Sequence, residues 1–220
     1  MDGNRYAEFM IESEKGELKI KISAVVEIFE HDLKSVKGGK KVFFNSASNF
    51  LMSEKYLEKD DSLIMSVGNS MLNKDTLKTI KKIYDYVSQK MTYTGFNPGQ
   101  IGAAKALKQL TGDCTEFTDL FVTLCRSCNI PAMAVDGYVL NYSVTPKHAW
   151  AEVFCNPYGW IRFDPTPGNL NVFNKLENQY IQFSTIKNDE NLKGHFYSFS
   201  YWGDPILILE EIKMKVASKS

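Results

Sequence analysis

Apolar residues recur at three- and four-residue spacing between positions 77 and 91, which is typical of one face of an amphipathic helix. The residues concerned are Leu77, Ile80, Ile83, Tyr84, Val87 and Met91. Asn73 precedes this pattern and is a residue type that often caps a helix N-terminus. Glycine and proline in residues 93–99 predict a loop. We expect a second, short helix from Ala103 to Leu110 that stops at Thr111-Gly112.

A third helical stripe follows in the segment GDCTEFTDLFVTLCRSCNIPA, which starts at Gly112. Its apolar positions fall on one face of a helix, and the charged positions fall elsewhere. The apolar set is Phe117, Leu120, Phe121, Leu124 and Cys128, and the charged set is Glu116, Asp119 and Arg126. Asn129 ends this helix, because Pro131 two residues later cannot continue it. Cys114 therefore opens a predicted helix.

Three strands are predicted after this helix. Residues 132–140 read as a strand broken at Asp136-Gly137, and the segments HAWAEVF (148–154) and GWIRF (159–163) read as the two arms of a hairpin. Trp150 and Trp160 are expected to pack on this sheet. Cys155 is expected at the hairpin turn.

The two ends of the chain also carry strand patterns. Residues 19–22 alternate between lysine and isoleucine, and β-branched and aromatic residues follow at 24–29 and 42–44. Gly38-Gly39 marks a turn. From residue 196 onward the pattern suggests one or two closing strands. We therefore divide the chain into a β-rich N-terminal extension (1–66) and a core with C-terminal closing strands (67–220).

Composition excludes several classes of protein. The 220 residues hold 26 basic and 26 acidic side chains, so the chain lacks the basic surplus that nucleic acid would require. No apolar run approaches the 18 or more residues of a membrane span. The first ten residues resemble no signal peptide. Location stays open: cytoplasmic if the chain is complete, periplasmic or exported if a leader was removed.

Four cysteines in a chain of this length do not make a disulfide scaffold, so reduced thiols are expected. Cys125 and Cys128 form a Cys-x-x-Cys pair, but they lie inside the predicted helix without a second pair. A structural metal site of that type needs four ligands. We therefore expect both to pack in the core, and we expect no metal and no cofactor.

Cys114, by contrast, opens its helix, where the positive end of the helix dipole favours the reactive thiolate. A cysteine nucleophile needs a base and a group that orients the base. The candidates are His148, at the start of one hairpin strand, and Asp164, at the end of the other.

The length of the hairpin loop decides whether His148 and Asp164 can meet. A two-residue turn would pair Asn156 with Gly159 and put the two side chains on opposite faces of the sheet. A three-residue loop would pair Cys155 with Gly159, and Asp164 would then lie opposite Trp150 and diagonal to His148 on one face. We predict this second register, with a carboxylate oxygen about 2.6–3.2 Å from an imidazole nitrogen.

These residues resemble a known family. The segment from Gly112, then GYV, HAWAEVF and GWIRFDPTPG, is similar to the core signature of the transglutaminase-like (papain-like) superfamily over about residues 74–170. The resemblance implies an α+β fold with the nucleophile helix packed on an antiparallel sheet. Cys114 matches the nucleophile, His148 the base and Asp164 the orienting acid. The upstream group that would stabilise an oxyanion is not identified by the motif, and Tyr93 and Gln100 are candidates.

The resemblance implies a thiol-dependent acyl-transfer enzyme that acts on a peptide bond or a glutamine carboxamide through a thioester. Hydrolysis, as in a cysteine protease or amidase, is the first interpretation. Cross-linking by a transglutaminase is the second. A contrasting interpretation is a non-catalytic binding or assembly module that docks through its N-terminal strands. The expected partner is a protein or peptide substrate.

Overall fold

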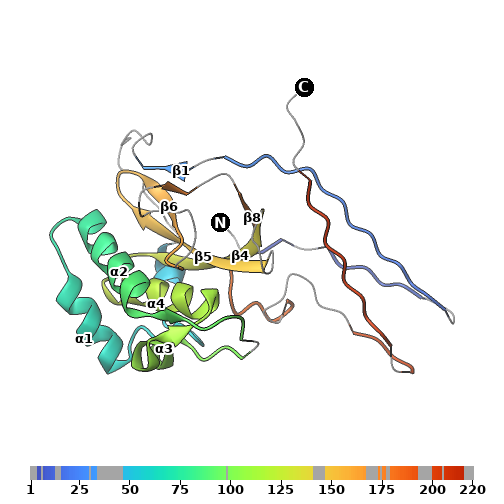
Figure 1. Cartoon of the computed structure of the whole chain (residues 1–220), viewed down its shortest axis with the longest axis horizontal. Helices are drawn as coiled ribbons and strands as arrows, with labels where there is room; N and C mark the ends of the chain where they lie inside the picture. Colours follow the sequence, from blue (N-terminus) through green and yellow to red (C-terminus); the bar gives the residue numbers. More distant parts are fainter. Residues whose placement is uncertain are drawn as a thin grey trace.

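The computed structural model describes residues 4–5, 7–12, 16–29, 31–33, 47–97, 99–140, 147–166, 173, 175–176, 179–192, 200–204 and 206–215. Within these ranges a four-stranded antiparallel sheet, in the order β6-β5-β4-β8, is covered on one face by helices (Figure 1). Its strands are β4 (Ala132–Val139), β5 (Lys147–Cys155), β6 (Gly159–Phe163) and β8 (Tyr180–Ser184). The architecture is the α+β arrangement that the sequence predicted.

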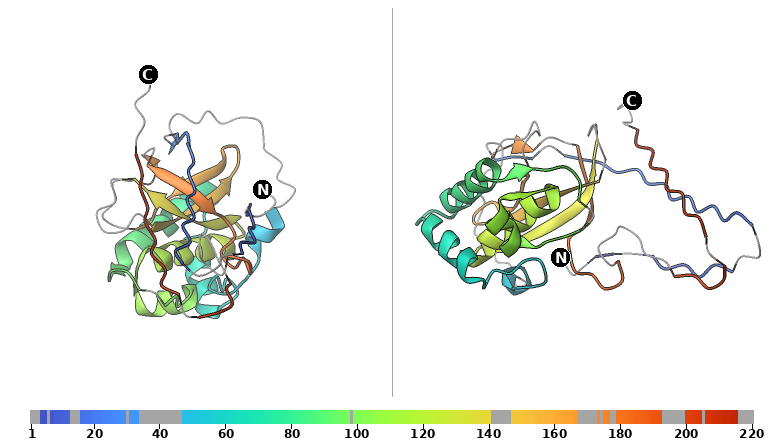
Figure 2. Two further views of the ribbon diagram at one scale, coloured as in Figure 1. Left: turned by 90° about the vertical axis from the view of Figure 1, so that its right-hand side faces the viewer. Right: turned by 60° about the horizontal axis from the view of Figure 1, so that its bottom comes forward.

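The helices are α1 (Ser62–Met71), α2 (Thr76–Lys90), α3 (Ala103–Gln109) and α4 (Cys114–Ser127), preceded by the 3-10 turn η1 (Ala47–Leu51). Helix α4 contacts β4 and β5 on one side and α1, α2 and α3 on the other, so it lies at the centre of the fold (Figure 2). None of the helices in the described ranges is long and apolar enough to cross a bilayer.

Two short pairings complete the described structure. β2 (Thr92–Tyr93) pairs in parallel with β3 (Thr111–Gly112), directly before α4. β1 (His31–Asp32) pairs antiparallel with β7 (Lys175–Leu176). The first of these pairings matters for function, because it fixes the two segments that enter the region around Cys114.

The predicted stripe of α4 forms the centre of the core. Phe117, Leu120, Phe121 and Leu124 have no exposed surface, and burying each such side chain is worth about 1.5–3 kcal/mol. An amphipathic pattern implies that the charged residues off the stripe face water. They do not, because Glu116, Asp119 and Arg126 are also buried. The helix is enclosed on all sides, so each of these three charges needs a partner within the protein.

Both faces of the sheet carry apolar side chains. The face toward α4 includes Ala134, Ala151, Val153 and Phe163, and the outer face includes a smaller cluster around Trp150, Val135 and Tyr180. As expected, Trp150 is fully buried and Trp160 packs against the outer cluster. Apolar side chains on both faces explain why β4 is apolar at adjacent positions from Ala132 to Val135 instead of alternating.

Several local expectations need correction. The N-cap of α2 is Asp75, whose side chain accepts from the backbone N–H groups of Leu77 and Lys78, and not Asn73. Strand β4 is unbroken against β5, and the irregularity at Asp136-Gly137 is a register shift against β8. Cys155 is the last residue of β5 and is buried. Helix α1 occupies residues for which we predicted no helix.

The strands expected at the chain ends are absent from the parts that the structure describes. Residues 19–29 and 206–215 are extended but form no ladder, and Figure 1 shows both segments running away from the helices. The likewise expected strand at 42–44 and turn at Gly38-Gly39 lie outside the described residues. Apolar alternation supplies strand propensity, but a strand forms only where a neighbouring segment completes its hydrogen bonds.

Candidate active site

Cys114 is the first residue of α4, and a capping box fixes the helix start. The Asp113 carboxylate accepts from the Thr115 N–H at 2.8 Å, and the Glu116 carboxylate accepts from the Asp113 N–H at 3.0 Å. Such reciprocal bonds satisfy two backbone donors that a helix start otherwise leaves unpaired. Of the four cysteines, all within the described ranges, only Cys114 is not buried. The capping box therefore holds an accessible thiol at a helix N-terminus.

The loop before α4 is tied to the same two carboxylates. The Asn97 N–H donates to Asp113 at 3.0 Å, and the Ile101 N–H donates to Glu116 at 3.4 Å. Gly112 has no room for a side chain, since a Cβ there would lie 2.3 Å from the Cβ of Glu116. The surroundings of Cys114 are thus built from the 97–101 loop, β3 and the first turn of α4.

The hairpin of β5 and β6 brings His148 and Asp164 together in the predicted register. Cys155 pairs with Gly159, and Ala151 pairs with Phe163, so Asp164 follows the last paired residue of β6. Gly159 has a φ of 80°, the left-handed conformation that suits a three-residue loop. His148 Nε2 and Asp164 Oδ2 are 2.8 Å apart, and both side chains are fully buried. The predicted register and distance are confirmed.

Three further groups hold Asp164. The Tyr180 hydroxyl donates to Oδ2 at 2.6 Å, and the Thr166 N–H donates to Oδ1 at 3.0 Å. The Tyr84 hydroxyl donates to the Asp164 backbone carbonyl at 3.1 Å. The sequence analysis did not identify either tyrosine. Tyr84 belongs to the apolar stripe of α2, and Tyr180 lies outside the segments that carry the motif, so neither had a recognisable signal.

The imidazole of His148 interacts with both other candidates. Burial alone would lower the pKa of His148, but the charge and hydrogen bond of Asp164, followed by the hydrogen bond and charge of Cys114, raise it to about 10. Nε2 contacts Asp164. The raised pKa favours the imidazolium form of the ring at neutral pH. This arrangement can both stabilise a thiolate and supply a proton.

The two oxyanion candidates differ in position. Tyr93 pairs with Gly112 across β2 and β3, two residues before Cys114, and its ring lies 6.4 Å from that of Phe117. Gln100 is exposed in the following loop, and no hydrogen bond joins it to Cys114 within the described part of the chain. Tyr93 is the better placed of the two by this geometry.

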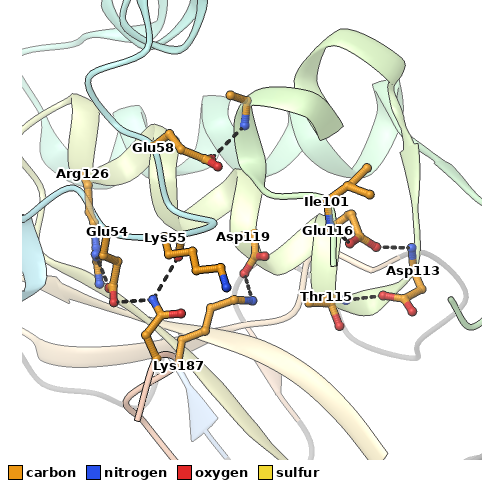
Figure 3. A network of polar contacts seen from close by, with 12 residues as sticks. Glu54, Lys55, Glu58, Ile101, Asp113, Thr115, Glu116, Asp119, Arg126 and Lys187 are labelled. Atoms are coloured by element: carbon orange, nitrogen blue, oxygen red, sulfur yellow. Dashed lines mark hydrogen bonds and ion pairs between the residues drawn. The ribbon is translucent and has the colours of Figure 1, made fainter. Parts of the chain in front are cut away.

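A buried network of charges lies beside the site, between α4 and the segment after β8 (Figure 3). The Lys187 ammonium contacts the Asp119 carboxylate, and both side chains are almost completely buried. Burial raises the pKa of Asp119 to about 7, although Lys187 opposes the shift. Burial lowers the pKa of Lys187, but Asp119 and Asp136 outweigh it and raise the value overall. We take these residues as an ion pair, because Lys187 keeps its proton.

The same network holds Arg126. Its guanidinium donates to the Glu54 carboxylate at 2.7 Å and to the Ala132 carbonyl at 2.8 Å. The Asn188 amide donates to the other oxygen of Glu54 at 2.8 Å (Figure 3). These bonds satisfy the buried charges of α4 and join the helix to segments on both sides of it in the sequence.

Cys125 and Cys128 are buried in the core, as expected. Burial raises the pKa of the Cys125 thiol well above its ordinary value, so the thiol stays protonated and unreactive. In the described ranges no three His, Cys, Asp or Glu side chains form a group that could hold a metal ion. A cavity of about 400 Å³ lies on the outer face of the sheet; Trp160, Arg162, Tyr180 and residues 26–29 are among its lining, whereas Cys114 and His148 are not.

Comparison with known proteins finds a family whose model matches part of the chain. Residues 67–165 match the model of the transglutaminase-like superfamily. A 155-residue alignment with "Uncharacterized protein YebA" of Bacillus subtilis (strain 168) is 26% identical and covers 57% of this chain and 21% of that protein. The chain thus matches about a fifth of the length of this curated relative.

One of the solved structures that this chain resembles has a TM-score above 0.5 and shows a similar fold. The crystal structure named "Putative Cysteine Protease from Cytophaga hutchinsonii" has a TM-score of 0.58 at 20% identity, with 75% of this chain and 56% of that chain covered. The periplasmic domain of TgpA from Pseudomonas aeruginosa bound to ethylmercury has a TM-score of 0.45 at 17% identity, covering 55% of this chain and 48% of that one.

Proposed function

We propose, because residues 67–165 match the model of the transglutaminase-like superfamily, that the chain is a thiol-dependent acyl-transfer enzyme with Cys114 as nucleophile. The observation that carries this proposal is the position of the His148 ring. It contacts the Asp164 carboxylate through Nε2 and interacts with the one cysteine that is not buried. A nucleophile, a base and an orienting acid in contact are what thiol-dependent catalysis requires.

The proposed reaction begins with the thiolate–imidazolium pair. The sulfur of Cys114 attacks a carboxamide carbon, and a C–S bond forms. The C–N bond then breaks, and the leaving amine takes its proton from the His148 imidazolium. The product of this half-reaction is a thioester and a neutral imidazole. Water attacks the thioester, gives a proton to His148 and releases a carboxylic acid, which restores the ion pair.

The remaining groups support these steps. Asp164 keeps the imidazole oriented and favours its protonated form between the two half-reactions. The Cys114 N–H, at the start of α4, is one donor for the oxyanion of the tetrahedral intermediate. Tyr93 is the candidate for the second donor, because β2 places it beside Gly112. Gln100 is the alternative.

The substrate is proposed to be a protein or peptide carboxamide, with hydrolysis as the reaction. Transfer to an amine differs only in what resolves the thioester. A peptide library incubated with and without a primary amine separates the two. Cleavage or deamidation without amine supports hydrolysis, whereas products that form only when the amine is present and carry it covalently support cross-linking.

A binding or assembly module is the contrasting interpretation, and thiol labelling tests it. We expect iodoacetamide at neutral pH to modify one cysteine rapidly, with the label mapped to Cys114, and the fast phase to disappear in Cys114→Ala. Cys125, Cys128 and Cys155 serve as internal controls because they are buried. A chain in which no cysteine reacts faster than a free thiol is not this enzyme.

A further inference from the structure

Oδ2 of Asp164 has two partners from different strands. His148 Nε2, from β5, lies 2.8 Å away, and the Tyr180 hydroxyl, from β8, donates at 2.6 Å. β6, which leads to Asp164, and β8 are the opposite edge strands of the sheet. The contact therefore joins its two edges at the point where the imidazole is held.

The ring of Tyr180 is itself fixed. It is 4% exposed, its backbone pairs with Val139, and its ring packs edge-to-face on Trp150 with centroids 5.1 Å apart. The ring of His148 lies 6.1 Å away. A hydroxyl on a buried ring with this packing has little freedom to leave its acceptor.

We infer that Tyr180 is a positioning residue that fixes the Asp164 carboxylate against the His148 imidazole. This inference rests on the proposed function for its catalytic consequence, but the hydrogen bond itself can be measured without any activity. A carboxylate has about four acceptor positions. The Thr166 N–H occupies one on Oδ1, while Tyr180 and His148 occupy two on Oδ2. Removing the hydroxyl therefore takes one side-chain donor away from a fully buried carboxylate.

Loss of the Tyr180 hydroxyl is expected to affect the Cys114 thiol indirectly, through the orientation of the His148 imidazole. Each donor to Asp164 restricts the rotation of the carboxylate, and a fixed carboxylate holds the imidazole in one orientation. Without the Tyr180 hydroxyl the carboxylate can turn about its Cβ–Cγ bond and meet Nε2 less directly. The imidazolium then faces Cys114 for a smaller fraction of the time, and thiolate formation falls.

The chain offers a matched control, because a second tyrosine also bonds to Asp164. Tyr84 also donates a hydroxyl to Asp164, but to the backbone carbonyl and at 3.1 Å. Burial, followed by the charges of Asp164 and Asp85, raises the pKa of Tyr84 to about 12, so this hydroxyl stays protonated. Tyr84→Phe removes one hydroxyl that bonds to Asp164, as Tyr180→Phe does, but from a partly buried ring, and it leaves the donors to the carboxylate in place.

The test compares both variants in the full chain. The first readout is the NMR signal of the His148 Nε2 proton, assigned by its loss in His148→Asn. The second is the rate of Cys114 alkylation by iodoacetamide between pH 6 and pH 10. We expect Tyr180→Phe to broaden or shift the imidazole signal and to slow alkylation at pH 7 about tenfold, the size expected for one hydrogen bond to a charged group. We expect Tyr84→Phe to lower the melting temperature and to change the imidazole signal and the alkylation rate less than Tyr180→Phe does, because the donors to the carboxylate are retained.

The two readouts separate this inference from the proposed function. An imidazole signal that responds to Tyr180→Phe supports the positioning role of Tyr180. If Cys114 in the unmodified chain reacts no faster than a free thiol, that result overturns only the proposed function. Identical imidazole spectra in Tyr180→Phe and Tyr84→Phe overturn the positioning role. Absence of the His148 signal from the unmodified protein also overturns it, because the hydrogen bond to Asp164 would then not be held.

Discussion

Gly137 lies directly opposite His148 in the ladder of β4 and β5. The register of β4 against β8 shifts between Asp136 and Gly137, and a Cβ on Gly137 would lie 2.0 Å from the Ile181 carbonyl oxygen and 2.6 Å from the Trp150 ring. Only a hydrogen atom at this position lets β8 approach. Since β8 carries Tyr180, the absent side chain of Gly137 shapes the surroundings of His148 and Asp164.

Gly137→Ala is therefore expected to lower the free energy of unfolding by about 1–3 kcal/mol, the range for overpacking a filled interior. It should also slow Cys114 alkylation, because β8 and Tyr180 must move. Urea unfolding and iodoacetamide labelling measure the two effects. Gly99→Ala is the control, since the nearest atom to a Cβ there is 3.5 Å away. Equal stability of the two variants would contradict the close packing at Gly137.

Cys114→Ala and Cys125→Ser should separate chemistry from packing. Cys114→Ala is expected to abolish turnover and leave the melting temperature almost unchanged, because the side chain is small and partly exposed. Cys125 is fully buried, so a serine hydroxyl there should reduce the free energy of unfolding by about 1–3 kcal/mol. Peptide turnover and thermal melting are the measurements. Equal loss of turnover in both variants, with unchanged melting, would show that Cys114 is not the nucleophile.

His148→Ala should slow alkylation of Cys114 at neutral pH. In the unmodified protein the raised pKa of His148, about 10, keeps an imidazolium beside the thiol across the neutral range. Removing that cation removes its stabilisation of the thiolate, so the rate should rise with pH as it does for an ordinary cysteine. Rates from pH 6 to pH 10 test this expectation. Superimposable profiles would mean that the imidazole and the thiol do not form an ion pair.

The stability of the fold should depend on pH through the same group. The pKa of His148 in the folded protein is about 10, well above the ordinary value of 6.5 for a histidine. The contribution of His148 to the free energy of unfolding is therefore complete below about pH 6.5 and is lost as the pH rises toward 10. The difference in unfolding free energy between the unmodified chain and His148→Gln should shrink over this window. Asp119, with a pKa of about 7, titrates in the lower part of this window, but it does so in both proteins, so its effect largely cancels in the difference. Urea titrations at pH 7, 8.5 and 10 measure the trend, and a constant difference would contradict it.

Lys187→Met tests the buried ion pair beside α4. The variant leaves the Asp119 and Asp136 carboxylates buried without their cation, and breaking a buried pair in this way costs about 3–5 kcal/mol. We expect a strong loss of stability in urea unfolding, reduced at low pH, where the carboxylates are protonated. Lys108→Met, on the exposed side of α3, is the control. A loss no larger than in that control would show that the pair does not stabilise the fold.

Local periodicity was sufficient to predict α4, the hairpin of β5 and β6, and the meeting of His148 with Asp164. The alternation of side chains along a strand separates a two-residue from a three-residue loop, and the requirement that His148 and Asp164 share a face selects the three-residue loop that the structure has. The capping residues around Cys114 are local in the same sense: Asp113 and Glu116 act within one helical turn. Asn73 was wrong as an N-cap because Asp75, two residues later, competes for the same role.

Only the tertiary structure decided which distant groups complete the site. Tyr180 reaches Asp164, and Lys187 reaches Asp119, from a segment with no recognisable motif, so no spacing rule connects them. The extended segments at 19–29 and 206–215 also show that local sequence does not specify distant partners. Their alternating residues specify a strand's side-chain pattern, but hydrogen-bond partners come from the rest of the fold. Sequence thus determined the elements whose interactions are local, and the tertiary structure decided which buried polar groups are paired across the sheet.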